Sequence, residues 1–138
     1  MNESHTPAED QATLWNNTAG HGWVDAQAIT DTMFAPFDAM LAGPVTPAVQ
    51  RDVLDIGCGT GSTTLAIAHR LPAGSCVGVD ISAPMIAAAQ QRAAHEGVSA
   101  RFLCADAQAY PFTAAAFDLI VSRFGVMFFD DSVQAFAN

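Results

Sequence analysis

Three aspartates and a run of glycines are the residues of this sequence whose types and spacing could do chemistry. The segment VLDIGCGTGSTT (53–64) has glycines at every second position, Gly57, Gly59 and Gly61, and Asp55 stands two residues before the first of them. Glycine tolerates positive φ angles and lets a ligand lie directly against the backbone. A tight strand-to-helix turn without a ligand would need the same residues, so the glycines alone leave the ligand open.

The spacing of these glycines favours one class of ligand over another. The dinucleotide fingerprint G-x-G-x-x-G, counted from Gly57, needs its third glycine at position 62, where this sequence has Ser62. The carboxylate of Asp55 would repel a diphosphate and attract an ammonium or sulfonium group. The loop therefore favours a cationic ligand, and NAD is the weaker interpretation.

Two further carboxylates stand where a nucleoside would need them. Asp80 ends a second apolar run, where a carboxylate can accept hydrogen bonds from both hydroxyls of a ribose. Asp106 follows a third apolar run and could accept a hydrogen bond from the amino group of a purine. Each aspartate alone is more often a helix cap or a solvated loop residue. Together with Asp55 they stand at the ends of three strands, which meet in one crevice of a parallel sheet.

The surrounding pattern predicts the elements that would position these groups. Apolar runs at 53–56, 76–81, 100–104 and 117–122 predict four strands, and helices are expected between the first three. The runs are continuously apolar, which is typical of parallel strands that are covered on both faces. The sequence thus predicts an α/β, Rossmann-like parallel sheet with helices on both faces.

A different pattern precedes the first strand. Residues 1–10 are polar and acidic and are expected to form a disordered lead-in. Residues 11–50 predict a helical segment that is broken at Gly20 and Gly22 and kinked or split at Pro36. Its apolar stripe consists of Ile29, Met33, Phe37 and Met40 or Leu41.

Composition and charge exclude several classes of protein. The 138 residues suit one domain, and a hydrophobic content of 51% argues against wholesale disorder. Five basic residues against 14 acidic ones give a net charge of −9, so neither a nucleic acid nor a membrane surface is expected as a partner. Cys58, Cys76 and Cys104 form no C-x-x-C motif, so no metal site is predicted and a reducing cytoplasm is favoured. The polar start is unlike a signal peptide.

The motifs resemble those of the class I S-adenosylmethionine-dependent methyltransferases, particularly the small-molecule subgroup that includes ubiquinone/menaquinone-biosynthesis methyltransferases. The matching segments keep the family's order and spacing: VLDIGCGTGSTT (53–64), VGVDIS (77–82) with PMI (84–86), FLCADAQAYPF (102–112) and FDLIVSRFGVMFF (117–129). The resemblance implies the strand order 3-2-1-4 and a cofactor-binding domain at 51–138, preceded by a helical lid at 11–50. The family's later strands are not found, so the domain is expected to be truncated after the fourth strand.

The resemblance also implies which residues bind the cofactor, S-adenosylmethionine. They are Asp55, Gly57, Gly59, Thr60, Gly61, Asp80, Ile81, Met85, Asp106, Ala107 and Ser122. Asp55 and the glycine loop would hold the methionine part, and Asp80 would bind the ribose hydroxyls. Ile81 and Met85 would flank the adenine. Asp106 and the backbone of Ala107 would contact its edge. Ser122 would line the cofactor next to the methyl group.

Residues outside these motifs have open roles. Trp15 would close the methionine end as part of the lid, or would simply pack the lid onto the domain. Arg123 and Phe124 would border the acceptor pocket, although a surface ion pair is an equally good interpretation for the arginine. No catalytic residue is identified, and His21 is the one histidine worth testing as a general base.

The predicted function is transfer of a methyl group from S-adenosylmethionine to a small-molecule acceptor. A truncated binding or assembly module without turnover is the alternative, and an NAD-dependent oxidoreductase is less favoured by the glycine spacing. The fourth strand, residues 117–122, would be an apolar edge, which predicts pairing with a second copy, exchange of elements between copies, or precipitation.

Overall fold

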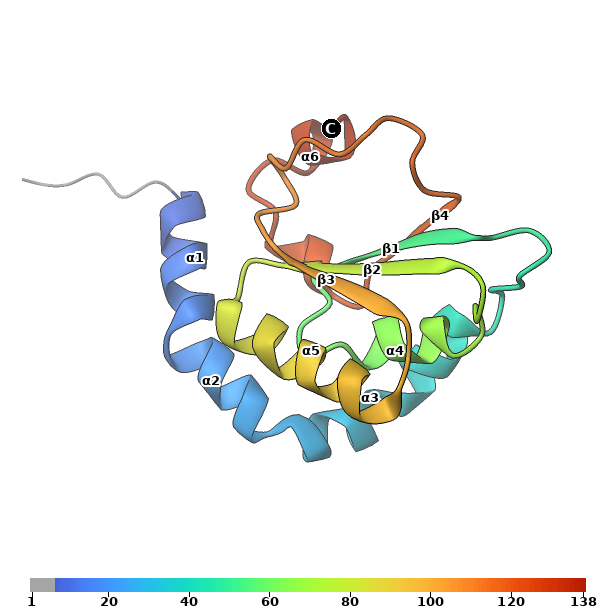
Figure 1. The fold of residues 1–138 in the computed structure, drawn as a ribbon. Coiled ribbons are helices and arrows are strands. Elements are labelled where there is room, and N and C mark those ends of the chain that lie inside the picture. Colours follow the sequence, from blue (N-terminus) through green and yellow to red (C-terminus); the bar gives the residue numbers. More distant parts are fainter. Residues whose placement is uncertain (1–6) are drawn as a thin grey trace, which may run out of the picture.

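The computed structural model describes residues 7–138, and Figure 1 shows its layers of helices and strands. The elements follow in this order: α1 (Pro7–Asn16), α2 (Thr18–Asp25), α3 (Gln27–Ala42), β1 (Asp52–Ile56), α4 (Ser62–Ala68), β2 (Ser75–Asp80), α5 (Ala83–Glu96), β3 (Ala100–Cys104), β4 (Leu119–Val121), the 3-10 helix η1 (Gly125–Phe128) and α6 (Ser132–Phe136). The disordered lead-in predicted for 1–10 lies outside the described residues as far as residue 6, and α1 begins at Pro7.

The strands form one parallel sheet in the order β3-β2-β1-β4, which confirms the predicted fold class and strand order. At the carboxyl ends, Ile56 of β1 lies opposite Val79 of β2, and Asp80 lies opposite Cys104 of β3. Because the pairing is parallel, the loops that follow β1, β2 and β3 all leave from the same edge of the sheet.

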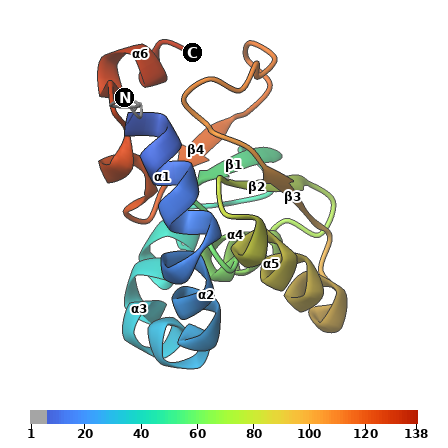
Figure 2. The same ribbon diagram turned by 90° about the vertical axis from the view of Figure 1, so that its left-hand side faces the viewer.

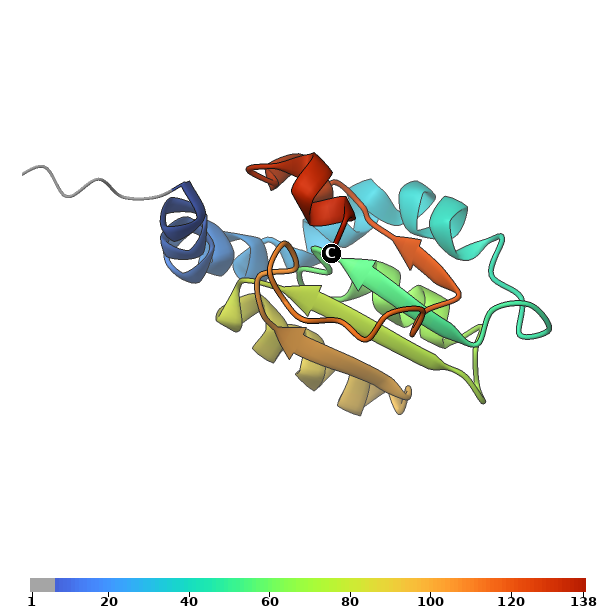
Figure 3. The same ribbon diagram turned by 90° about the horizontal axis from the view of Figure 1, so that it is seen from above.

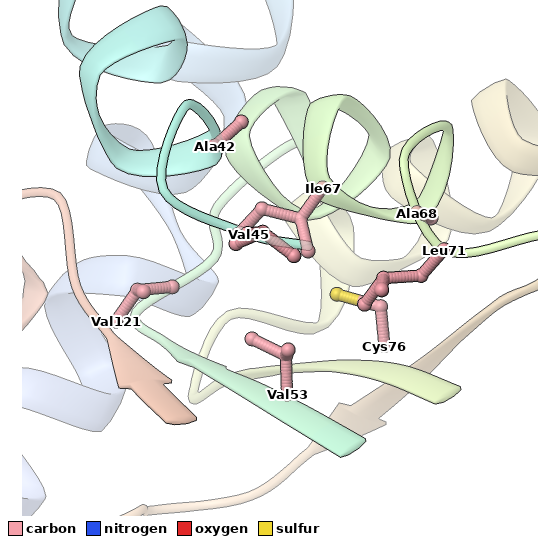
Figure 4. Packing of buried hydrophobic residues seen from close by; sticks show 8 residues of the cluster. All are labelled: Ala42, Val45, Val53, Ile67, Ala68, Leu71, Cys76 and Val121. Atoms are coloured by element: carbon pink, nitrogen blue, oxygen red, sulfur yellow. The ribbon is translucent and has the colours of Figure 1, made fainter. Parts of the chain in front are cut away.

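The two faces of the sheet are covered differently. On one face, α3 and α4 pack on β1, β2 and β4 around a buried apolar cluster, which Figure 4 shows: Ala42, Val45, Val53, Ile67, Ala68, Leu71, Cys76 and Val121. The opposite face carries Leu54, Ile56, Val77 and Val79, and the loop 105–118, η1 and α6 lie over it (Figures 1 and 3). Helical elements thus lie on both faces, the longer ones on one of them.

The N-terminal helices pack closely beside the sheet, and α1 passes in front of the carboxyl ends of the strands (Figure 2). The chain turns at Asn17 and Ala26, whereas the predicted breaks at Gly20 and Gly22 were wrong, since both glycines lie inside α2. A β-carbon at Gly20 would lie 1.9 Å from the carbonyl oxygen of Trp15. This glycine is therefore needed for the close approach of α2 to the end of α1.

Helix α3 differs from its prediction in two respects. It continues through Pro36 as one helix, so the predicted split does not occur. Its apolar stripe also faces solvent, with exposed fractions between 40% and 72% for Ile29, Met33, Phe37 and Met40. The buried side of α3 instead carries Asp38, whose carboxylate lies 2.7 Å from the guanidinium of Arg123. This ion pair joins α3 to the segment that follows β4.

The ends of the other elements follow capping and hydrogen bonding. Ser82 caps α5 and Gly97 ends it with a φ of 65°. Helix α4 ends at Ala68. Strand β4 covers less than the predicted run 117–122, and the Asp118 carboxylate before it accepts hydrogen bonds from the backbone N–H groups of Arg51 and Asp52. No helix within residues 7–138 combines the length and apolar character needed to cross a membrane.

Candidate functional site

A cavity of about 300 Å³ lies at the carboxyl ends of β1, β2 and β3. It is lined by the loops after these strands, by residues of α1 to α3 and by residues of the segment 123–129. Most of the residues predicted from the sequence line it: Trp15, Gly57, Gly59, Thr60, Asp80, Ile81, Met85, Asp106 and Ala107. The predicted residues Asp55, Gly61 and Ser122 lie outside its lining.

The glycine loop follows β1 and presents bare backbone to the cavity. Gly57 and Gly59 have φ angles of +69° and +55°, in the region that favours glycine. The N–H groups of Gly57 and Cys58 donate to the carbonyl oxygen of Val79 over 2.8 and 3.0 Å, which ties the loop to β2. A β-carbon at Gly59 would lie 2.8 Å from Cε of Met85, another residue of the lining. Because that atom is the end of a flexible side chain, the positive φ rather than the lack of space is what requires glycine here.

The third glycine of the motif has a packing role instead. Gly61 is the N-cap of α4 with a φ of +88°, and a β-carbon there would lie 3.0 Å from Cβ of Ala89 and 3.1 Å from the ring of Phe102. Since Gly61 does not line the cavity, the structure offers no direct contact for its predicted binding role. It allows α4 to start close to α5 and β3.

Asp80 is fixed by the backbone on both sides. Its Oδ2 accepts a hydrogen bond of 2.8 Å from the N–H of Gly59, and its Oδ1 accepts one of 2.9 Å from the N–H of Ser82. Burial raises the pKa of the Asp80 carboxyl, and these hydrogen bonds act in the opposite direction. The carboxylate therefore joins the glycine loop to the start of α5 and stays oriented along the cavity wall.

Asp106 is held by a local turn after β3. Its Oδ1 accepts hydrogen bonds from the backbone N–H and the side-chain amide of Gln108, at 2.9 and 3.4 Å. Among the residues with described side chains, no donor contacts Oδ2. With Ala105 and Ala107 beside it in the lining, Asp106 leaves one carboxylate oxygen available to a ligand.

Asp55 lies beneath the glycine loop, 1% exposed, and not in the cavity lining. Its Oδ2 accepts a 2.7 Å hydrogen bond from the hydroxyl of Thr64, whereas its buried Oδ1 has no partner among the described residues. Burial raises the pKa of this carboxyl to about 7, against the smaller lowering effect of the Thr64 hydrogen bond. An unpaired buried oxygen of this kind costs free energy unless a bound water or ligand satisfies it.

Ser122 holds the segment that follows β4. Its hydroxyl donates to the carbonyl oxygen of Ile56 over 2.8 Å and accepts a 3.2 Å hydrogen bond from the N–H of Val126. This places it behind the cavity wall rather than in it. The next residues come so close to the loop that a β-carbon at Gly125 would lie 2.7 Å from Cα of Gly57.

Aromatic side chains also line the cavity, and most of them were not predicted from the sequence as residues of the site. Trp15 packs edge-on against Phe128 at 5.2 Å, and Phe34 contacts Trp23 at 6.1 Å and Phe124 at 5.7 Å between ring centroids. Phe34 was missed because it lies off the predicted apolar stripe of α3. We call Gly57, Gly59, Asp80 and Asp106 the polar wall, and Trp15, Trp23, Phe34, Phe124 and Phe128 the aromatic wall.

Two predictions concern groups that a reaction would need. The exposed His21 has its Nδ1 2.9 Å from the carbonyl oxygen of Asn17 and lies outside the cavity lining, which gives no support to a role as base. Within the described part of the chain, no group of three His, Cys, Asp or Glu side chains is placed to hold a metal ion.

Comparisons with known proteins agree with this geometry. The model of the methyltransferase domain family matches residues 53–138. A demethylmenaquinone methyltransferase of Thermus thermophilus is 41% identical over 83 residues, which are 60% of this chain and 38% of that protein. Aklanonic acid methyltransferase DauC of a Streptomyces species is 34% identical over 106 residues, 75% of this chain and 48% of that protein. The chain thus spans less than half the length of these relatives.

A solved structure extends the likeness to the N-terminal helices. A putative S-adenosyl-L-methionine-dependent methyltransferase from Methanococcus maripaludis superposes with a TM-score of 0.73 at 23% identity, covering 99% of this chain and 60% of that one. At this identity the likeness concerns the fold. It includes the helices that carry part of the aromatic wall.

Proposed function

The chain belongs to the class I S-adenosylmethionine-dependent methyltransferases, and on this premise we propose that its cavity binds S-adenosylmethionine for methyl transfer to a small-molecule acceptor. One observation carries the proposal: the loops after β1, β2 and β3 bring Gly59, Asp80 and Asp106 into the lining of the same cavity. Parallel α/β sheets bind nucleotide ligands at this edge.

The polar wall offers the acceptors that a nucleoside needs. Each carboxylate oxygen of Asp80 accepts one backbone hydrogen bond and keeps acceptor capacity for a ribose hydroxyl. Oδ2 of Asp106 can accept from the amino group of an adenine, with Ile81 and Met85 providing apolar contacts for the ring. The bare backbone of Gly57 and Gly59 leaves room for the part of the cofactor beyond the ribose.

Asp55 would act on the cofactor without touching it directly. Its burial beneath the loop argues against direct contact with the methionine ammonium group. A bound water that donates to the unpartnered Oδ1 would connect the carboxylate to this group. A cationic ligand above the loop would also favour the ionised form of Asp55.

The residues of this chain would contribute binding and orientation to the reaction. S-adenosylmethionine, when bound, supplies a methyl group that its sulfonium centre already activates. Holding the acceptor in line with that group is the main requirement for rate. The aromatic wall offers an acceptor an apolar surface, to which Phe34 and Phe124 contribute.

Calorimetric titration of the chain with S-adenosylhomocysteine and with NAD tests the proposal. We expect saturable 1:1 binding of S-adenosylhomocysteine and at least about 100-fold weaker binding of NAD, because the glycine spacing departs from the dinucleotide fingerprint and the Asp55 carboxylate disfavours a diphosphate. Tighter binding of NAD would reject the methyltransferase assignment in favour of a dinucleotide enzyme.

Binding without turnover is the second candidate. It is favoured by one observation, that the chain covers 38% and 48% of the two relatives named above. Incubation with methyl-labelled S-adenosylmethionine and a panel of phenols and quinones separates the two functions. Label transferred to an acceptor supports the enzyme, and tight S-adenosylhomocysteine binding with no transfer supports the binding module.

We further propose that a second copy of the chain covers the outer edge of β4. This strand pairs only with β1 in the sheet, and Ile120 is 57% exposed on it. Apolar edge strands favour pairing with another strand. Light scattering should show a concentration-dependent dimer that Ile120→Lys weakens, while Val133→Lys on the exposed side of α6 has no effect. A monomer at all concentrations would contradict it.

The acidic net charge supports an acceptor other than a nucleic acid, and the absence of disulfides among Cys58, Cys76 and Cys104 supports a location in the cytoplasm.

A further inference from the structure

Arg123 stands out among the cavity residues because its guanidinium is both enclosed and oriented. Its side chain is 15% exposed, and its carbon Cζ lies 5.0 Å from the centre of the Phe34 ring. Its Nη1 donates to Oδ1 of Asp38 over 2.7 Å and to the hydroxyl of Ser62 over 2.8 Å. These contacts come from α3 and from the first residue of α4, so the side chain is fixed from two directions.

The contacts occupy only one of the three guanidinium nitrogens. Among residues 11–138, whose side chains are described, no acceptor contacts Nε or Nη2 of Arg123. Among the described residues, Oδ1 of Asp55 is the only fully buried side-chain nitrogen or oxygen without a hydrogen-bond partner, so these two nitrogens are not fully buried. The edge formed by Nε and Nη2 is therefore open, and this edge matches the two oxygens of a carboxylate.

Arg123 also supplies the one positive charge among the described cavity residues. The charged groups that share the lining with it are the carboxylates of Asp80 and Asp106, both on the polar wall. Ser62 follows directly after the glycine loop, so the arginine lies at the side of the cavity where that loop ends. A ligand with its nucleoside at Asp80 and Asp106 would extend past the loop toward this cation.

We propose that the free edge of Arg123 binds the carboxylate of the cofactor's methionine part. The inference rests on the proposed function and assigns the end of the cofactor that the polar wall leaves without a partner. Asp38 acts as a positioning residue: it holds Nη1 and thereby turns Nε and Nη2 toward the ligand. Stacking on Phe34 restricts the guanidinium further, which reduces the entropy lost on binding.

Two ligands that differ by the amino-acid part test this assignment. S-adenosylhomocysteine carries the carboxylate, and 5′-methylthioadenosine lacks the whole amino-acid part while keeping the nucleoside and the sulfur. In calorimetric titrations, Arg123→Met should weaken S-adenosylhomocysteine about 10- to 100-fold. It should change 5′-methylthioadenosine less than about threefold. Arg101→Met, an exposed arginine outside the cavity lining, is the matched control and should change neither.

A second variant guards against loss of the fold, because Arg123→Met leaves the buried Asp38 without its cation. The double variant Asp38→Asn/Arg123→Gln removes both charges and should show the same selective loss of S-adenosylhomocysteine. Arg123→Lys should restore only part of the affinity, since an ammonium lacks the planar edge. Equal loss of both ligands would mean a structural role and would overturn the inference, as would no loss of either. If the wild-type chain binds neither ligand, the proposed function itself is wrong.

Discussion

The two walls of the cavity are built by different kinds of interaction. On the polar wall, Asp80 accepts backbone N–H groups at 2.8 and 2.9 Å, and the loop is tied to β2 by further backbone hydrogen bonds. On the aromatic wall, rings contact one another at centroid distances above 5 Å, and Phe124 and Phe128 are 47% and 41% exposed. Hydrogen bonds fix positions closely, whereas half-exposed rings can shift.

This difference indicates how binding is divided between the walls. Under the proposed function, the polar wall would bind the fixed groups of the cofactor, and the aromatic wall would recognise an acceptor by shape and apolar contact. We therefore expect substitutions on the polar wall to affect cofactor affinity far more than those on the aromatic wall.

The largest effect is expected for Gly59→Val. A branched side chain at a φ of +55° is strained and would push against Cε of Met85, on the surface that we propose binds the cofactor. We expect S-adenosylhomocysteine affinity to fall more than about 100-fold, measured by calorimetry. Gly97→Val is the matched control, because Gly97 has a φ of +65° with no atom within 4 Å of its missing β-carbon. Equal losses in both variants would contradict a specific role for Gly59.

Asp80→Ala should have the next largest effect. Loss of hydrogen bonds to a charged group costs about 1.5–3 kcal/mol, so affinity for S-adenosylhomocysteine should fall about 10- to 150-fold. Asp118→Ala removes another carboxylate that accepts two backbone N–H groups, outside the cavity lining, and should leave the affinity unchanged. Unchanged affinity in a folded Asp80→Ala protein would reject the ribose assignment.

Asp55 supports the polar wall from below and should make stability depend on pH. Its pKa of about 7 exceeds its usual value of 3.8, so the folded state keeps a proton that the unfolded state has released. Stability should therefore decrease as pH rises from about 4 to 7, by on the order of 2 kcal/mol between pH 5 and 8. The raised pKa of Asp80 acts in the same direction.

Urea unfolding at several pH values measures this dependence. Asp55→Asn should flatten it, whatever the variant's absolute stability. Asp118→Asn should not, because backbone hydrogen bonds lower the pKa of Asp118 and it stays ionised throughout this range. Parallel pH curves for wild type and Asp55→Asn would contradict the assignment of the protonated carboxyl to Asp55.

The smallest effect is expected on the aromatic wall. Phe124→Ala removes a half-exposed ring whose backbone already has a φ of +66°. Calorimetry should show S-adenosylhomocysteine affinity within about threefold of wild type, because the ring packs against the rings of Phe34 and Phe37 and offers the cofactor no hydrogen bond. A loss of affinity comparable to that of Asp80→Ala would contradict the expectation that the polar wall determines cofactor affinity.

The sequence predicts the polar wall well for a physical reason. Its residues sit in turns directly after strands, so local spacing and parallel pairing are sufficient to bring Gly57, Asp80 and Asp106 together. The positions of Gly61 and Ser122 outside the cavity lining could not be predicted from spacing. Whether a small residue faces the ligand or a neighbouring helix depends on packing, as Ala89 and Phe102 show for Gly61.

The aromatic wall depends on contacts between segments far apart in the chain. The apolar stripe of α3 suggested a buried face, yet Ile29, Met33 and Met40 of this stripe are exposed, whereas Asp38 pairs with Arg123 and Phe34 lines the cavity. The partnership of these two charges is set by tertiary packing. Hydrophobic periodicity cannot predict this ion pair, because an aspartate on a helix is normally expected to face solvent.

Backbone amide NMR during titration with S-adenosylhomocysteine tests the division between the walls most directly. The account predicts that the largest chemical-shift changes fall on residues 57–61, on Ser82 and on Ala107, around the polar wall. Amides of the apolar cluster between α4 and the sheet, such as Ile67 and Leu71, should change little. Shift changes concentrated elsewhere, for example on Gln91 and His95 of α5, would contradict the account, because those residues line a different depression on the surface.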